Sequence, residues 1–551
     1  MKLDHVVSGV AIAIVSVICT FAPGATKDDT RTPVHPGEPG VRPFWNAHAL
    51  RFVYAPAFDL PKVEGATHYR FSVTARDGQK QEMTAAQPWA PLSPIWEDVC
   101  EGYATLKVEG IDPAGNVVGT SGEKAFYRSL GFSGEAGEPR KVYHDAGREA
   151  LEAMFAAPHV QHWLKDSNPD PSYARYCYPN KVIGGLVRGM TAYSKAAERE
   201  EDRVAARTIA CTAADYLLSL RFPKDAAYAD AAPTYAMNVD QVARKELTPQ
   251  RVKNRWLLIP STVDSALAYL DLYDLTRDAK YLDAAKAAAD TLARRQDPDG
   301  TWPLMADWKT GKAVAPNRLI PTWVIFLFDR LDQQYQLTQH RDARGRAWGW
   351  ILSNPLKTYQ WDAQFEDIVL REPYVNMARE QACDVAVLLL SNGKRTDQDI
   401  KQAEELIRFA EDQFVCWAPV QDVAGWRKAM PKRYDNAEIW IVPGVFEQYV
   451  CYGPVARSAA VMINTYLKAH EVTGSATYFE KAKALSNGMI AGQQYAAEHF
   501  NTNGEIPTWN MKRKPINWLN NSFYAADALL NVARHEQSGQ RTSSSEGAAS
   551  R

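Results

Sequence analysis

Two stretches between predicted helices, residues 361–380 and 433–454, place acidic side chains among aromatic ones. Glu438 and Glu447 in the second stretch have large apolar neighbours, and burial there is expected to raise the pKa of a carboxyl. Two carboxyl groups, one protonated and one charged, can hydrolyse a glycosidic bond by acid and base catalysis. The candidates for these two roles are Glu366, Asp367, Glu438 and Glu447.

The first stretch also carries a tyrosine, an amide and an arginine close together, at Tyr374, Asn376 and Arg379. This set suits a different reaction, the β-elimination of a uronate polymer. A tyrosine or histidine would remove the proton at C5, while the amide and the guanidinium neutralise the carboxylate and stabilise the enolate-like charge. The residues alone leave both reactions open, and a charged, solvated loop is a third interpretation.

Aromatic and polar residues recur on the other segments between helices. Sugar rings stack on aromatic faces and offer hydroxyls to amides and guanidinium groups, so such segments are typical of a saccharide cleft. Structural packing is the alternative for each of them. The candidates for substrate binding are Tyr176, Tyr178, Asn180, Arg255, Trp256, Trp302, Trp361, Tyr449 and Trp509.

Asp264 lies in the first turn of a helix predicted to begin near Ser261. A carboxylate at this position can complete a capping box, in which the side chains of the helix start satisfy its free backbone N–H groups. We therefore expect a structural role for Asp264 rather than a catalytic one.

Apolar residues recur at helical spacing from about residue 141 to 536, and this region contains an internal repeat. Residues 269–296 and 466–493 share one pattern at a constant spacing of 197, and a fainter copy starts at Tyr193. Each strong copy is followed by a glycine turn with proline and tryptophan, at 300–303 and 504–509. The matched pairs are Tyr269/Tyr466, Thr276/Thr473, Tyr281/Tyr478 and Gln296/Gln493.

This series of helical hairpins resembles the six-hairpin glycosidase superfamily, which includes unsaturated uronyl hydrolases and several polysaccharide lyases. The resemblance covers residues 141–536 and implies a mainly α fold, an (α/α)6 or (α/α)7 toroid. Long aromatic loops favour a closed ring around a central site over an open solenoid. The resemblance also implies a carbohydrate-active enzyme, either a glycoside hydrolase or, as the alternative, a polysaccharide lyase. A non-catalytic glycan-binding protein is the third hypothesis.

Residues 42–131 differ from the rest because apolar and polar residues alternate between glycine and proline turns. The pattern predicts a small β-sandwich that is similar in size and strand rhythm to fibronectin type III modules. We expect this module to support the toroid without carrying chemistry. A polar linker, residues 26–41, precedes it, and a tail rich in Ser and Gly, residues 537–551, is predicted to be disordered.

The first 25 residues, a lysine followed by an apolar run and small residues, read as a signal peptide. They predict a secreted or periplasmic protein, with attachment to the cell surface left open. No later segment has the length of a membrane span. With 63 Lys and Arg against 65 Asp and Glu, the chain has no basic field for nucleic acid. The expected partner is a poly- or oligosaccharide.

The sequence indicates no cofactor and no metal. It lacks a glycine-rich phosphate loop, a Rossmann fingerprint and the Gly-x-Ser-x-Gly motif of a nucleophilic serine. The seven cysteines show no CxxC pair. His159 and His162 could share one helix face, but no cluster of acidic ligands accompanies them.

Overall fold

A computed structural model describes residues 29–34, 37–41, 44–235, 256–362, 364–365, 379–430, 436–449, 451–500, 504–512 and 517–549. The predicted signal peptide, residues 1–25, lies outside the described residues, as does part of the linker. Among the described residues, no helix combines the length and the apolar character that crossing a membrane requires.

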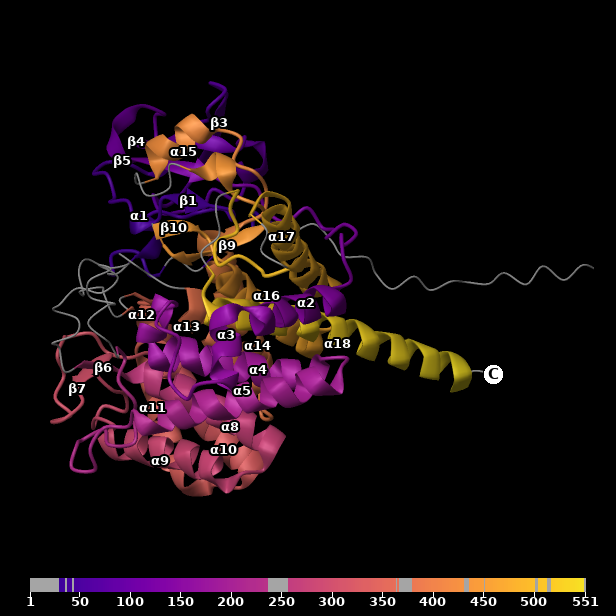
Figure 1. Cartoon of the computed structure of the whole chain (residues 1–551). Helices are drawn as coiled ribbons and strands as arrows, with labels where there is room; N and C mark the ends of the chain where they lie inside the picture. The colour runs from indigo at the N-terminus through magenta and orange to yellow at the C-terminus, as the bar shows by residue number, and fades with distance from the viewer. Residues whose placement is uncertain are drawn as a thin grey trace, which may run out of the picture.

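Six inner helices form a closed ring, because each packs against the next and the last, α18, returns to the first, α4 (Figure 1). The inner helices are buried around most of their circumference, as expected of a central layer. Their bounds are α4 (Gly184–Ala196), α8 (Ile259–Thr276), α10 (Thr322–Tyr335), α13 (Arg379–Ser391), α16 (Ala456–Thr473) and α18 (Leu519–Ala549).

Each inner helix carries an outer helix that buries one face against it, so the described residues form six hairpins. The predicted mainly α toroid is therefore confirmed, in its (α/α)6 form. The first outer helix pairs with the last inner one, α18, which joins the two ends of the ring. The outer helices are α2 (Tyr143–Ala156), α5 (Glu200–Ser219), α9 (Ala279–Arg295), α11 (Arg341–Ser353), α14 (Asp397–Phe414) and α17 (Ala476–Phe500).

The sequence repeat corresponds to two equivalent hairpins, α8–α9 and α16–α17. Helices α8 and α16 begin and end at positions that differ by the same 197 residues, and so do the starts of α9 and α17. The rings of Tyr269 and Tyr281 stack with centroids 6.5 Å apart. Those of Tyr466 and Tyr478 stack in the same way at 6.1 Å. The same residues therefore join the inner and outer helix in both hairpins.

The repeated glutamines connect each hairpin to the next outer helix of the ring. The Gln296 side chain donates hydrogen bonds to the carbonyls of Gly300, in the turn, and of Ala343, on α11. Gln493 donates to the corresponding carbonyls of Gly504 and of Ala146, on α2. The prediction that both turns join equivalent helices of one ring is confirmed.

The N-terminal module contains one five-stranded sheet in the order β1-β5-β4-β2-β3, antiparallel except for the β1–β5 pair. The predicted β-sandwich is not confirmed, because the described residues of the module form one sheet, with irregular chain packed against it. Trp96 from that layer is fully buried and donates its indole N–H to the carbonyl of Val53. The strands are β1 (Arg51–Phe52), β2 (His68–Thr74), β3 (Lys80–Ala85), β4 (Gly102–Ile111) and β5 (Val117–Arg128).

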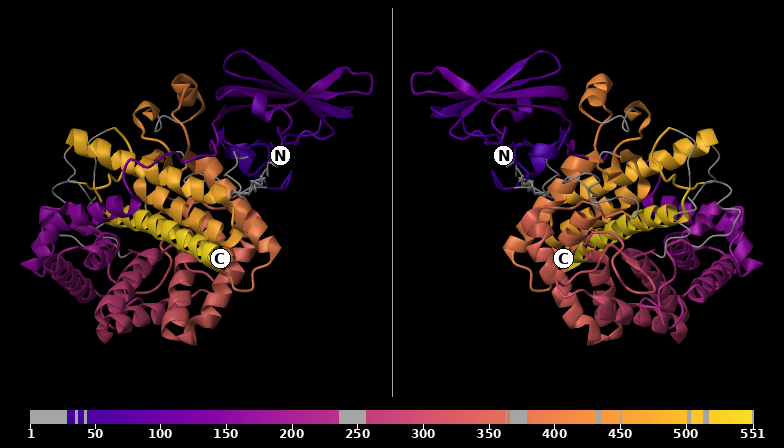
Figure 2. Two further views of the ribbon diagram at one scale, coloured as in Figure 1. Left: turned by 90° about the vertical axis from the view of Figure 1, so that its right-hand side faces the viewer. Right: turned by 90° about the vertical axis from the view of Figure 1, so that its left-hand side faces the viewer.

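The sheet stands outside the ring, as Figure 2 shows, and docks on it through buried polar contacts. Asp412 at the end of α14 accepts hydrogen bonds from the backbone N–H groups of Val53 and Tyr54, at 2.6 and 2.9 Å. Arg51 donates to the carbonyl of Val415 at 2.8 Å. The contacts hold the module at the end of the ring where the inner helices begin.

Short elements complete the fold, and α18 runs beyond the ring to Ala549. It therefore includes most of the tail for which the composition predicted disorder. The short helices are α1 (Trp45–His48), α3 (Pro158–Gln161), α12 (Pro355–Thr358) and α15 (Val423–Ala429). The short strands are β6 (Trp256–Leu258), β7 (Met305–Asp307), β8 (Val415–Cys416), β9 (Gly444–Gln448) and β10 (Cys451–Pro454).

The turn after α9 should tolerate no side chain at Gly300. Its φ of 98° is rare for other residues, and an added Cβ would lie 2.5 Å from the carbonyl oxygen of Arg346 on α11. We expect Gly300→Ala to lower the free energy of unfolding by about 2 kcal/mol or more. Gly345→Ala, on the open face of α11, should instead raise it by about 0.5–1 kcal/mol. Urea denaturation of both variants checks this, and equal effects would contradict the packing of the turn on α11.

Candidate active site

A cavity lies at the end of the ring where the inner helices begin. Its polar lining comes from several elements that are far apart in the sequence: Asp264 on α8, Glu380 on α13, Arg457 on α16, Glu447 on β9 and Lys181 in the turn before α4. Trp323 of α10 and Phe365 add aromatic surface. Three carboxyl groups and two cations therefore meet in one cavity beside aromatic rings.

Asp264 does not cap its helix. Helix α8 begins at Ile259 and has no side-chain hydrogen bond at its N-terminus, and Asp264 lies more than one turn inside it, where it lines the cavity. The expected capping role is therefore wrong. Burial raises the pKa of Asp264 to about 7, although the charges of Arg457 and Arg188 oppose the shift. A carboxyl with this pKa is protonated in a large fraction of molecules at neutral pH.

Arg457 is held in one position by contacts on several sides. Its Nη2 lies 2.9 Å from Oε1 of Glu380, and both side chains are about one-eighth exposed. The guanidinium also lies over the rings of Trp323 and Tyr524, 5.2 and 4.7 Å from their centroids. Glu380 is therefore a paired carboxylate, and Arg457 presents a fixed positive charge to the cavity.

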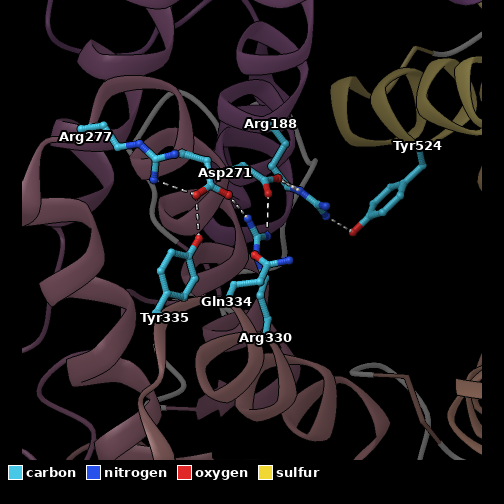
Figure 3. A network of polar contacts seen from close by, with 8 residues as sticks. Arg188, Asp271, Arg277, Arg330, Gln334, Tyr335 and Tyr524 are labelled. Atoms are coloured by element: carbon cyan, nitrogen blue, oxygen red, sulfur yellow. Dashed lines mark hydrogen bonds and ion pairs between the residues drawn. The ribbon is translucent and has the colours of Figure 1, made fainter. Parts of the chain in front are cut away.

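An ion-pair network connects four inner helices next to this cavity (Figure 3). Arg188 of α4 donates to Asp271 of α8 at 2.6 Å and to the hydroxyl of Tyr524 of α18 at 3.2 Å. Arg330 of α10 donates to the other oxygen of Asp271 at 2.6 Å. Burial alone would raise the pKa of Asp271, but the two guanidinium groups outweigh it and the pKa is lowered.

The structure places one of the predicted catalytic acids, Glu447, in the cavity. Glu438 is elsewhere: its side chain is 49% exposed and pairs with Arg427 at 3.0 Å. The apolar surroundings expected for Glu438 are therefore wrong, because the short helical turn that carries it lies at the surface. Arg379 begins α13, but its side chain is outside the described residues, as are Glu366, Asp367, Tyr374 and Asn376 entirely.

Several residues predicted to bind substrate are instead buried in structural contacts. Trp302 donates its indole N–H to the carbonyl of Leu292, and Asn180 donates to those of Ala232 and Pro233. The other three are Tyr176, which contacts Trp163, Trp361, which packs on Tyr359, and Tyr449, whose hydroxyl accepts from the N–H of Leu50. An aromatic residue with one polar atom suits the core as well as a sugar, so composition could not separate the two roles.

The remaining predicted binding residues stay predictions. Tyr178 is mostly buried against Trp518, while Trp256 and Trp509 are partly buried. Arg255 lies outside the described residues. Of the histidines considered for metal binding, His159 is partly buried and stacks on Tyr173 with centroids 4.0 Å apart. No group of three or more His, Cys, Asp or Glu side chains that could hold a metal occurs in the described part of the chain.

Asp264, Glu380, Arg457, Lys181 and Trp323 were not among the predicted site residues. Four of them lie in the first two turns of an inner helix, and Lys181 lies in the turn before α4. The five residues therefore share a position at the start of an inner helix. A comparison of the helix starts at the spacing of the repeat could have identified this end of the ring as the place of the site.

No model of a known protein family matches this chain, and neither does any curated protein sequence. Among solved structures, a family 76 glycoside hydrolase from a bovine Bacteroides thetaiotaomicron strain is 12% identical, with a TM-score of 0.46 over 84% of this chain and 93% of that one. An unsaturated glucuronyl hydrolase specific for heparin is 12% identical, with a TM-score of 0.44 over 72% and 97%. Cellobiose 2-epimerase from Spirochaeta thermophila is 13% identical, with a TM-score of 0.44 over 72% and 98%.

The pKa of Asp264 should make the stability of the chain depend on pH. The pKa is about 7 in the folded chain against 3.8 for a free aspartate, so the folded state binds this proton more tightly. The resulting stabilisation is complete below about pH 4 and is lost as the pH rises through 7. Between pH 5 and pH 8, we expect the free energy of unfolding of wild type to fall by about 2 kcal/mol relative to that of Asp264→Asn.

Urea denaturation of both proteins at the two pH values measures this difference. Asp283→Asn, an exposed aspartate on α9, is the matched control and should follow wild type at both pH values. Parallel pH profiles for wild type and Asp264→Asn would show that Asp264 ionises as it does in water.

Proposed function

We propose that the chain is a carbohydrate-active enzyme that hydrolyses glycosidic bonds of an oligo- or polysaccharide. The observation that carries the proposal is the pKa of Asp264, about 7, in a cavity that contains a second carboxyl, Glu447. General acids of hydrolases need a pKa near the working pH, because the group must be protonated and still be able to give up its proton. We also propose that it acts outside the cytoplasm, on the basis of the apolar N-terminal segment.

In the proposed reaction, Asp264 donates its proton to the glycosidic oxygen as the bond to the anomeric carbon breaks. The carboxylate of Glu447 then takes a proton from the attacking water or attacks the anomeric carbon itself. Glu380 is less suited to this second role because its charge is paired with Arg457 at 2.9 Å. Trp323 and Phe365 offer faces for the sugar ring, and Lys181 can bind its hydroxyls.

A polysaccharide lyase is the second candidate function, and two observations favour it. Arg457 and Lys181 place positive charge where a uronate carboxylate could bind. Tyr524, which lies against Arg457 and accepts a hydrogen bond from Arg188, could exchange a proton with the sugar. However, burial raises the pKa of Tyr524 above its usual value, which makes its phenolate harder to form as a base. Hydrolysis is therefore the better-supported reaction.

A panel of plant, algal and microbial polysaccharides tests the proposal. Wild type should release new reducing ends, and kcat/KM should fall above about pH 7 as Asp264 loses its proton. We expect Asp264→Asn and Glu447→Gln each to lower kcat by about 10²- to 10⁴-fold, the usual contribution of an acid or base. Asp283→Asn makes the same chemical change on the outer helix α9 and should retain wild-type kcat.

The other outcomes separate the alternatives. Products that absorb in the ultraviolet as conjugated uronates would identify a lyase. Saccharide binding with no product of either kind would identify a glycan-binding protein. Full activity of Asp264→Asn would remove Asp264 from the reaction.

A further inference from the structure

A second cleft adjoins the candidate active site. The two share Ile320 and Gln364 in their linings, so these residues form the wall between them. The Gln364 side chain is fixed, since its amide donates to the carbonyls of Arg318 and Asp362 and its oxygen accepts from the N–H of Ile320. A substrate chain that leaves the active-site cavity across this wall enters the second cleft.

One wall of the cleft is aromatic. Trp350 lies in the last turn of α11, at the end of the ring where the inner helices begin, and its side chain is only partly buried. Within the described residues, its indole N–H has no hydrogen-bond partner. Trp350 therefore offers both an apolar face and a donor to a ligand, the combination that suits a pyranose ring.

The polar groups around Trp350 are amides and hydroxyls. Asn354 uses its amide N–H group on the carbonyl of Trp350, at 2.9 Å, which leaves its side-chain oxygen as an acceptor. The exposed amide of Gln360 makes no hydrogen bond to the rest of the described chain. The hydroxyl of Thr358 donates to the carbonyl of Asn354 and retains its acceptor capacity. These groups complement the hydroxyls of a sugar.

The charges of the cleft disfavour an acidic ligand. Its cation, Arg318, is engaged by Asp297 and Asp299, each at 2.6 Å from one of its terminal nitrogens. The cleft also contains the carboxyl of Asp362. Among the described residues that line the cleft, a uronate carboxylate would meet Asp362 and no cation other than the engaged Arg318, in contrast to the cavity with Arg457 and Lys181.

We infer that this cleft is a second sugar-binding site, which holds a neutral sugar unit of the substrate against Trp350. The inference rests on the proposed function and extends it. The enzyme binds at least two units of its substrate, and the unit beyond Gln364 is uncharged. The contact with Trp350 then contributes to the affinity for chains and not for single sugars.

Calorimetric titration tests the inference in an Asp264→Asn background, in which turnover is expected to be slow. The probes are linear neutral gluco-, manno- and xylo-oligosaccharides, from the monosaccharide to the hexasaccharide. Affinity should increase when the chain becomes long enough to reach the cleft, and Trp350→Ala should remove about tenfold of that increase. Monosaccharide binding should be unchanged by this substitution.

Trp348→Ala is the matched control, since Trp348 lies on the same helix but packs on Arg344 and does not line the cleft. It should keep the full dependence on chain length. Equal affinities with and without Trp350, or no binding of any neutral oligosaccharide, would overturn the inference. Tighter binding of uronate oligomers at Trp350 would overturn the assignment to a neutral sugar. Cleavage by Asp264→Asn at the wild-type rate would contradict the proposed function alone, because the loss of affinity at Trp350 is measured separately.

Discussion

The partly buried ion pair between Arg188 and Asp271 is the interaction on which the centre of the ring depends. Together with Arg330 and Tyr524 it connects α4, α8, α10 and α18, four of the six inner helices (Figure 3). Removing one partner of such a pair leaves the other charge uncompensated at a place where its side chain is only about one-fifth exposed. The network therefore holds these helices at the positions from which their first turns meet around the cavity.

The same helix carries two aspartates that the environment divides into different roles. Asp264 and Asp271 are seven residues apart on α8 and so lie on one face, two turns from each other. Two guanidinium groups keep Asp271 ionised, whereas Asp264 has no such partner at hydrogen-bond distance in the described part of the chain, and its pKa rises to about 7. One helix therefore carries both a carboxyl that can be protonated at neutral pH and a carboxylate that joins the inner helices.

The ring could be predicted from the sequence because the residues that join its helices recur at a fixed spacing. Tyr269, Tyr281 and Gln296 make local contacts, and their copies at a spacing of 197 make the same ones. The site is harder to predict, because burial there depends on helices distant in the chain. Asp264 has the sequence context of a capping residue, and only α13 and α16 bring Glu380 and Arg457 to it. The sequence also does not distinguish Trp302 from Trp350, yet Trp302 is in the core and Trp350 lines a cleft.

The N-terminal module contacts the chain close to Glu447. Glu447 is carried by β9, which pairs with β8 on one side and β10 on the other. Directly after β9, the hydroxyl of Tyr449 accepts a hydrogen bond from the N–H of Leu50 at 2.6 Å, and its ring packs on Trp45 of the module. Docking of the module therefore restrains the chain two residues from Glu447. The N-terminal module thus helps to define where Glu447 stands in the cavity.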